Sequence, residues 1–413
     1  MITTINNKHN KLNVPNSTDK GNAIRNLPNL RFPEFREEWE EHELSEYLDF
    51  KNGLNPKPNQ FGKGIKFISV MDILNNAVIT YDCIRASVSV SEEDMSAFSV
   101  QKGDILFQRS SETLEDVGRA NVYVDDIPAV FGGFVIRGKQ KTNYNPLFFK
   151  YLLSSPLARK RIIRMGAGAQ HFNIGQEGLS KVKLPFACID EQNKIAKILY
   201  LLDKRISLQN KIIEDLKKLK SAIIEKLYSE IQGKEYSYRQ LFEIINERNN
   251  RLEFSNVLSA SQERGMVSRE ELNLDIHFER SNISTYKIVK NGDYVIHLRS
   301  FQGGFAFSEK TGICSPAYTV LRPNNLLVYG YLSNYFTSRD FVKSLIIVTY
   351  GIRDGRSINV DEWLDMKVII PSKERQTHIV NVIGSIENKI KNEETYSNCL
   401  LNQKQYLLRQ MFI

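Results

Sequence analysis

The chain has 413 residues, of which 41% are hydrophobic and 10% aromatic, enough to build two or three domains with sizeable cores. Lysine and arginine number 56 against 48 acidic residues, and the formal net charge of +8 favours a polyanionic partner without naming one. The four cysteines are far apart and form no CxxC pair, which argues against a disulfide framework and a thiolate metal site and fits a reducing cytoplasm.

Residues 1–28 are polar and predict a disordered tail. No apolar run approaches the roughly 20 residues that a membrane span needs, and the N-terminus has no segment of signal-peptide type. We therefore expect a soluble cytoplasmic protein without a membrane partner.

The first predicted globular domain covers residues 29–184. Short β-like runs such as "IKFISV" and "AVFGGFVIRG" alternate with helix-like stretches, which indicates an α+β fold. "KGDILFQRSS" predicts a tight Gly-Asp turn into a strand that ends on Arg109 and Ser110. A basic helix-like stretch then runs through Arg164 into the glycine-containing loop "GAGAQHFNIG".

A long helix is predicted within residues 185–233. Ten positions follow 4,3 spacing, the a/d seam of a coiled coil: Ile195, Leu199, Leu202, Ile206, Gln209, Ile213, Leu216, Lys220, Ile223 and Leu227.

The rest of the chain repeats this plan. A second globular domain is predicted over 234–370 and a second long helix over 371–413, with seam positions from Ile379 to Met411 at a constant offset of 184 from Ile195 to Leu227. Two polar interruptions match at this offset, Gln209 with Glu393 and Lys220 with Lys404. The sequence "NGDYVIHLRSF" also repeats the Gly-Asp turn.

The matched polar positions lead to a specific pairing hypothesis. If the two helices pack antiparallel about a pseudo-two-fold axis, Lys220 faces Glu393 and Gln209 faces Lys404, and these pairs fix the helix register.

Basic and amide-bearing loops recur at equivalent places in both domains and are the candidate DNA-contacting residues. Glycine lets the backbone approach phosphate, arginine binds phosphate or guanine bidentately, and glutamine can recognise adenine. Solvated surface charge is an equal alternative for any single residue. The candidates are Arg109, Ser110, Arg164, Gln170, His171, Arg299, Ser300, Gln302, Arg353 and Arg356.

Catalytic signatures are missing from the sequence. "GLNPKPNQFGKG" lacks phosphate-loop spacing, "GAGAQHFNIG" lacks the third glycine of a dinucleotide fingerprint, and "NPLF" lacks the second proline of an amino-methyltransferase loop. No histidine falls at metal-ligand spacing with cysteine or carboxylates. We expect no catalytic residues, no metal site and no cofactor in this chain.

The pattern resembles the specificity subunit of type I restriction-modification systems over residues 28 to 413. The most specific element is "PNLRFPEFREEWEEHELSEY", supported by the proline-then-glutamine entry into each helix in "LPFACIDEQNKIAKIL" and "IPSKERQTHIVNVI". The resemblance implies two target-recognition domains, each contacting half of a split site in double-stranded DNA, separated by two long helices that form an antiparallel coiled coil.

The same resemblance implies the partners. Two modification subunits would bring S-adenosylmethionine and methylate adenine, and restriction subunits with motor and nuclease activity would use ATP and Mg²⁺. Two alternatives remain at this point: a self-contained DNA methyltransferase or nuclease with fused recognition domains, and a coiled-coil scaffold that binds no nucleic acid.

Overall fold

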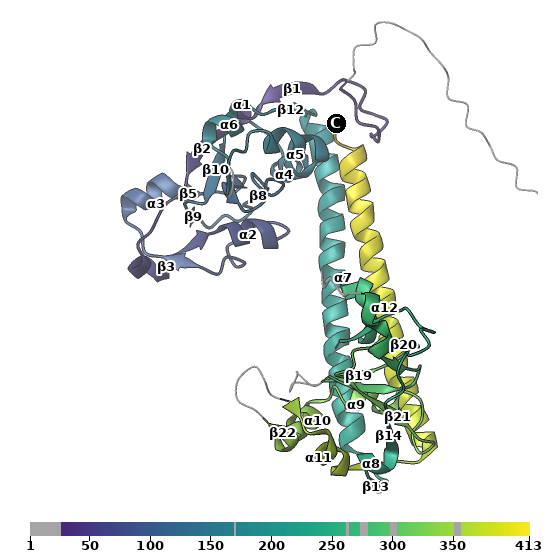
Figure 1. Ribbon diagram of the computed structural model, residues 1–413. Coiled ribbons are helices and arrows are strands. Elements are labelled where there is room, and N and C mark those ends of the chain that lie inside the picture. Colours follow the sequence, from purple (N-terminus) through teal and green to yellow (C-terminus); the bar gives the residue numbers. More distant parts are fainter. Residues whose placement is uncertain (1–25, 169–170, 262–263, 273–279, 298–303, 351–356) are drawn as a thin grey trace, which may run out of the picture. The chain divides into compact units, whose positions relative to one another are not determined.

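The protein forms two compact units, Met1–Ser207 with Asn398–Ile413 (unit 1) and Leu208–Ser397 (unit 2). A computed structural model describes residues 26–168, 171–261, 264–272, 280–297, 304–350 and 357–413 (Figure 1). The tail predicted over 1–28 lies almost wholly outside them. Each unit mixes strands with helices, which confirms the α+β class.

Unit 1 is built around two sheets with strand orders β2-β10-β6-β8 and β4-β3-β9-β5, and it also has the two-stranded pairs β1-β12 and β7-β11. Its elements are β1 (Glu40–Glu43), α1 (Leu44–Tyr47), β2 (Leu48–Asn52), η1 (Pro58–Gln60), β3 (Phe61–Ile68), α2 (Val70–Asn75), β4 (Ser87–Val88), α3 (Glu92–Phe98), β5 (Ser99–Val100), β6 (Ile105–Gln108), β7 (Ser110–Ser111), β8 (Ala120–Val122), β9 (Ala129–Phe131), β10 (Val135–Gln140), α4 (Pro146–Ser154), α5 (Pro156–Ile163), β11 (Phe172–Asn173), α6 (Gln176–Ser180) and β12 (Lys183–Phe186).

The core of unit 1 includes residues from the far end of the chain. Phe412 is 5% exposed and packs against Trp39 and Phe148, with ring centroids 6.1 and 5.5 Å away. The main-chain N–H of Leu30 donates to the carbonyl of Gln410 at 2.8 Å. The aromatic side chains of the N-terminal and C-terminal segments therefore share one apolar cluster.

Unit 2 has a sheet of order β14-β21-β18-β19 and the pairs β13-β24, β15-β16, β17-β20 and β22-β23. Trp363 stacks on Tyr238 at 4.3 Å in its core. The elements are β13 (Lys234–Ser237), α8 (Tyr238–Leu241), β14 (Phe242–Ile245), β15 (Leu258–Ser261), β16 (Gly265–Ser268), η2 (Arg269–Leu272), η3 (Arg280–Thr285), β17 (Lys287–Val289), β18 (Tyr294–Ile296), β19 (Phe305–Phe307), β20 (Gly312–Cys314), β21 (Thr319–Pro323), α9 (Tyr331–Tyr335), α10 (Arg339–Ser344), η4 (Leu345–Val348), β22 (Thr349–Tyr350), β23 (Ser357–Ile358), α11 (Val360–Asp365) and β24 (Lys367–Ile370).

The two units repeat one another in detail, as the sequence predicts. The Gly-Asp turns before β6 and β18 have nearly the same backbone, with φ of 95° at Gly103 and 94° at Gly292, a conformation that glycine adopts readily. Asp104 accepts from the N–H of Gln101 at 2.9 Å, and Asp293 accepts from the N–H of Lys290 at 2.8 Å. The sheet order β2-β10-β6-β8 corresponds position by position to β14-β21-β18-β19, and the pair β1-β12 corresponds to β13-β24, whereas the remaining strands pair differently in the two units.

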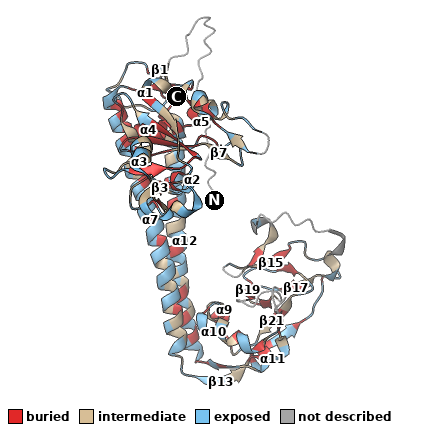
Figure 2. Cartoon of the chain, turned by 90° about the vertical axis from the view of Figure 1, so that its left-hand side faces the viewer, coloured by how far each residue is buried: buried red, intermediate tan, exposed pale blue. Residues whose placement is uncertain are grey.

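The long helices are α7 (Ile189–Ser229) and α12 (Lys373–Gln410), and each contributes to both units. Every predicted seam position in α7 and α12 is buried or half-buried, whereas most other positions are exposed. Figure 2 shows this alternation of buried and exposed faces along both helices. In unit 2, Ser397 Oγ donates to Asn210 Oδ1 at 2.9 Å and Lys220 pairs with Glu387 at 2.6 Å. The partner numbers fall along α12 as they rise along α7, so the helices are antiparallel.

The predicted register is wrong. Lys220 pairs with Glu387, six residues from the expected Glu393, which is roughly 9 Å along a helix. Gln209 donates to the carboxylate of Glu393, and Lys404 pairs with Asp203 at 2.6 Å. Glu387 and Asp203 lie beside the seam rather than in it. The long side chains of Lys220 and Lys404 extend from seam positions to these flanking acids, and the lysines therefore do not pair with the opposite seam residues.

The four cysteines are all free, so no disulfide is formed. Among the helices that the structure describes, none is long and apolar enough to cross a membrane.

Candidate nucleic-acid interface

In unit 1, predicted contact residues lie beside two short paired segments, which we call the contact hairpin and define as the described residues 167–168 and 171–173. Ala167 and Asn173 form its bridge, and β11 at its end pairs with β7, placing Asn173 opposite Ser110. The hydroxyl of Ser110 donates to Asn173 Oδ1. His171 is exposed, and Gln170 lies outside the described residues. Sequence reasoning identified Ser110 and His171 but missed Asn173, which joins them.

Arg109 connects the contact hairpin to the turn between β9 and β10. Its carbonyl accepts from the N–H of Ile174 at 2.9 Å, and its own N–H donates to the carbonyl of Phe134 at 2.9 Å. The guanidinium donates one bond, from Nη1 to the carbonyl of Gly133 at 3.2 Å, and the residue is half-buried. The remaining guanidinium donors leave Arg109 able to contact a ligand without losing this position.

Helix α5 carries basic residues with two different roles. It begins after Ser155, whose hydroxyl accepts from the N–H of Ala158, and proline occupies its first position, which stabilises a helix start. Arg159 is held inside, with Nη2 donating to the carbonyls of Glu115 and Val117 at 2.9 and 2.6 Å, and burial lowers its pKa to about 10.

The other basic residues of this segment differ in exposure. Arg161 pairs with Glu41 at 2.5 Å, so Arg161, like Arg159, stabilises the domain. Lys160 and Arg164 are exposed, and Arg164 directly precedes the contact hairpin. Of the four cations in this stretch, Lys160 and Arg164 are therefore the ones placed to meet a phosphate backbone.

Unit 2 has a matching hairpin formed by β22 and β23, with Thr349 opposite Ile358 and Tyr350 opposite Ser357. The predicted Arg353 and Arg356 fall in the sequence between these two strands and lie outside the described residues. The same holds for Arg299, Ser300 and Gln302. Those predictions stay untested.

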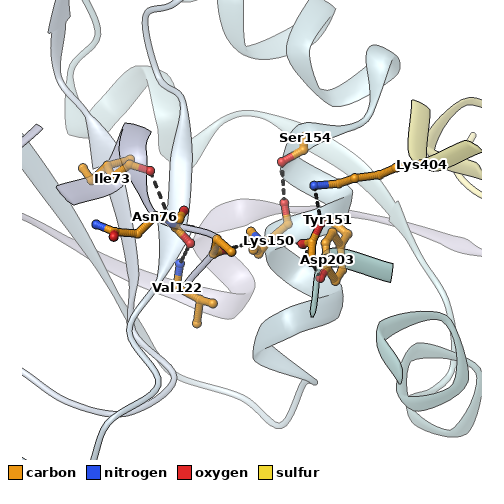
Figure 3. A network of polar contacts seen from close by, with 10 residues as sticks. Ile73, Asn76, Val122, Lys150, Tyr151, Ser154, Asp203 and Lys404 are labelled. Atoms are coloured by element: carbon orange, nitrogen blue, oxygen red, sulfur yellow. Dashed lines mark hydrogen bonds and ion pairs between the residues drawn. The ribbon is translucent and has the colours of Figure 1, made fainter. Parts of the chain in front are cut away.

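A buried polar network secures α4 to α7 and α12 within unit 1 (Figure 3). Asp203 on α7 accepts from the hydroxyl of Tyr151 at 2.8 Å and lies 3.3 Å from Lys150 Nζ and 2.6 Å from Lys404 Nζ. Lys150 also donates to the carbonyl of Ala77. Periodicity had singled out only Lys404 among the members of this network. Lys150, Tyr151 and Asp203 show no such signal, because they are polar or aromatic residues outside the repeated seam positions.

Burial and charge act in opposite directions in this network. Burial disfavours ionised Asp203, but Lys150 and Lys404 outweigh it and lower the pKa of the carboxyl. For Lys150, burial dominates over the attraction of Asp203 and lowers the pKa to about 8, with Lys404 adding repulsion. The two lysines share one carboxylate, so the network depends on the charge of both.

Metal chemistry finds no support in the described part of the chain, where no three histidine, cysteine, aspartate or glutamate side chains cluster in a way that could hold an ion. The candidate surfaces consist of exposed cations, hydroxyls and amides next to small hairpins. This chemistry suits binding to a polyanion and recognition of base edges.

Comparison with known proteins shows what this chain is similar to. Residues 36–218 match the family described as type I restriction modification DNA specificity domain. This part of the chain is therefore similar to type I specificity domains. A Methanocaldococcus jannaschii protein, provisionally named the specificity subunit of type I restriction enzyme MjaX, is 24% identical over 394 residues, which cover 88% of this chain and 90% of that protein.

Solved specificity structures share the fold. The type I restriction-modification S subunit from M. genitalium has a TM-score of 0.55 at 16% identity, covering 94% of this chain and 99% of that one. A chain from a structure of type I system assembly and conformational transition has a TM-score of 0.55 at 13% identity, covering 90% and 96%.

Proposed function

We propose that this chain is the sequence-specific DNA-recognition subunit of a type I restriction-modification complex in the cytoplasm. Each unit contacts one half of a bipartite target in double-stranded DNA, and α7 and α12 set the spacer between the halves. The chain itself carries no catalytic residues. S-adenosylmethionine, ATP and Mg²⁺ act in the modification and restriction subunits.

The observation that carries this proposal is the repeated arrangement of a hairpin behind a short helix in both units. In unit 1 the contact hairpin follows α5, and in unit 2 the hairpin of β22 and β23 follows α10 and η4. Duplicated domains suit a target with two half-sites, because protein pseudo-symmetry is matched by the arrangement of half-sites.

An exposed apolar stripe on α7 supports the docking of modification subunits. In unit 2, Leu208, Ile212 and Leu219 are 58%, 38% and 50% exposed and recur on one face of the helix, beside the seam that packs on α12. Clustered exposed apolar residues of this kind mark protein interaction surfaces.

The decisive experiment is co-expression of this chain with the modification subunit encoded beside it, followed by mapping of methylated adenines in the host DNA. We expect methylation at one bipartite sequence, with neither protein sufficient alone. Methyl transfer by the purified chain would instead favour a self-contained enzyme. An assembled complex with no salt-dependent DNA binding would favour the scaffold alternative.

A further inference from the structure

The turn between β9 and β10 in unit 1 is held firmly by its surroundings. Residues 132–135 form a β-turn in which the N–H of Val135 donates to the carbonyl of Gly132 at 2.8 Å. The N–H of Leu54 donates to the carbonyl of Phe131 at 2.9 Å, and the N–H of Gly53 donates to the carbonyl of Val135 at 3.2 Å. The strands on both sides of the turn thus fix its position against a third segment.

The two glycines of the turn lie close to neighbouring side chains. A Cβ atom on Gly133 would lie 2.0 Å from Asn55 Oδ1, and one on Gly132 would lie 2.7 Å from the Phe67 ring. A side chain at either position would require Asn55 or Phe67 to move. The next residue along the chain, Phe134, is the one that the turn can present.

Phe134 is 67% exposed, whereas Phe131, which ends the strand before the turn, and Val135, which begins the strand after it, are fully buried. A single exposed apolar side chain is common on protein surfaces and has no meaning by itself. The position of this phenylalanine is what distinguishes it. Its carbonyl accepts from the N–H of Arg109, and the Arg109 guanidinium donates to the preceding carbonyl, that of Gly133.

Arg109 in turn precedes Ser110, which pairs with the contact hairpin. The exposed ring of Phe134 and the exposed residues of the contact hairpin are therefore joined through one arginine by main-chain hydrogen bonds. In an interface with DNA, such cations and hydroxyls position the backbone, while an apolar side chain contacts thymine methyl groups and so distinguishes bases.

We propose that Phe134 is an apolar base-contacting residue that sets sequence preference within the half-site bound by unit 1. This inference rests on the proposed DNA-recognition function. It adds a residue that carries no charge and that was not among the candidates from the sequence. The signal that could have found it is the Gly-Gly pair before an aromatic residue in "AVFGGFVIRG".

The test uses the complex of the full chain with its modification subunits and a library of DNA duplexes randomised across both half-sites, with bound molecules sequenced. We expect Phe134→Ala to lose about tenfold of its preference at one or two adjacent base pairs of one half-site. Preferences in the other half-site should be unchanged. The slope of log affinity against log salt should also be unchanged, because no charge is removed.

Two further variants make the result specific. Phe134→Leu keeps apolar bulk and should retain part of the preference. Ile127→Ala removes another exposed apolar side chain of unit 1, 53% exposed and located before β9 rather than after it, and should leave all preferences as in the unmodified chain.

Three results would overturn the inference while leaving the proposed function intact: wild-type preferences in Phe134→Ala, a loss spread evenly over all positions, or impaired association with the modification subunits. An unmodified complex that selects no sequence would defeat the proposed function itself. The two failures are thus separated by the behaviour of the unmodified complex.

Discussion

Gln192 and Gln376 make the same pair of backbone contacts at the starts of the two long helices. Gln192 Oε1 accepts from the N–H of Asn145 at 2.9 Å, and its Nε2 donates to the carbonyl of Ala187 at 2.8 Å. Gln376 Oε1 accepts from the N–H of Val328 at 2.8 Å, and its Nε2 donates to the carbonyl of Pro371 at 3.0 Å. Both glutamines are buried, and their numbers differ by the offset of the duplication.

Replacing either glutamine by alanine should destabilise its own unit by about 1–3 kcal/mol, because a part-buried backbone donor loses its acceptor. Hydrogen exchange should show faster exchange at the Asn145 amide in Gln192→Ala and at the Val328 amide in Gln376→Ala. Lys197→Ala, at an exposed position of α7, is the matched control. Equal protection of both amides in all variants would contradict a shared anchoring role.

The buried Lys150 should make stability depend on pH. Its pKa of about 8 lies below the ordinary value of 10.5, so the unfolded chain binds more protons than the folded chain between these values. Stability therefore rises with pH in this window, and the folded state's penalty for a buried charge is fully present below pH 8.

Between pH 8 and 10, the free energy of unfolding of the unmodified chain should rise by about 2 kcal/mol relative to Lys150→Met. Urea denaturation at several pH values, with Lys197→Met as control, measures the difference. A constant difference across this range would show that Lys150 titrates as an ordinary lysine.

Arg164→Ala should weaken DNA binding by the assembled complex without affecting assembly. If Arg164 contacts one phosphate, the slope of log affinity against log salt should shrink by about 0.9. Lys181→Ala is the control, since that exposed cation is paired with Glu177 at 2.6 Å. The same measurement on Arg353 and Arg356 tests the loop of unit 2. An unchanged slope would return each residue to the role of solvated surface charge.

Lengthening both helices should change the preferred spacer of the target. The observed pairing places the region of Asp215 opposite that of Asn392, so one heptad inserted after each keeps the seam in phase. Seven residues add roughly 10 Å, or about 3 base pairs.

A folded double-insertion complex, tested on duplexes with varied spacers, should keep both half-sequences and select a longer spacer, or lose binding because DNA also rotates as it lengthens. Selection of the original spacer would show that these helices do not set the distance.

Leu208→Asp should weaken association with a modification subunit, since a charge replaces a side chain that is 58% exposed on the apolar stripe of α7. We expect at least a tenfold loss of affinity in titration calorimetry, about 1.4 kcal/mol. Lys211→Asp, at a nearby exposed position off the stripe, is the control. Unchanged binding by Leu208→Asp would place the docking surface elsewhere.

The sequence predicted what depends on periodicity and repetition. The seam from Ile195 to Leu227, the antiparallel helices and the paired Gly-Asp turns follow from spacing and from an offset that holds through the chain. The register did not follow. A symmetric match of polar seam residues ignores that Lys220 can extend sideways to Glu387. The spacing of the sequence does not show whether Lys220 pairs with Glu387 or with Glu393.

The composition of the basic segments predicted where the candidate site lies, but not which of its residues are exposed. Arg159, Lys160, Arg161 and Arg164 have the same charge and lie within one turn and a half of helix, yet two are bound to neighbouring segments and two are exposed. Which member of a basic run is free depends on carbonyls and carboxylates that are distant in sequence, such as Val117 and Glu41. A single sequence does not specify those distances.

The burial of Phe412 against Trp39 has a consequence for biosynthesis. The ribosome makes residues 398–413 only after all of unit 2, so the aromatic core of unit 1 stays incomplete while unit 2 emerges and folds. The domain that is translated first is thus the one that finishes last. A stalled or clipped chain lacking its final turn of α12 would carry an open apolar surface, a state that quality-control chaperones and proteases recognise.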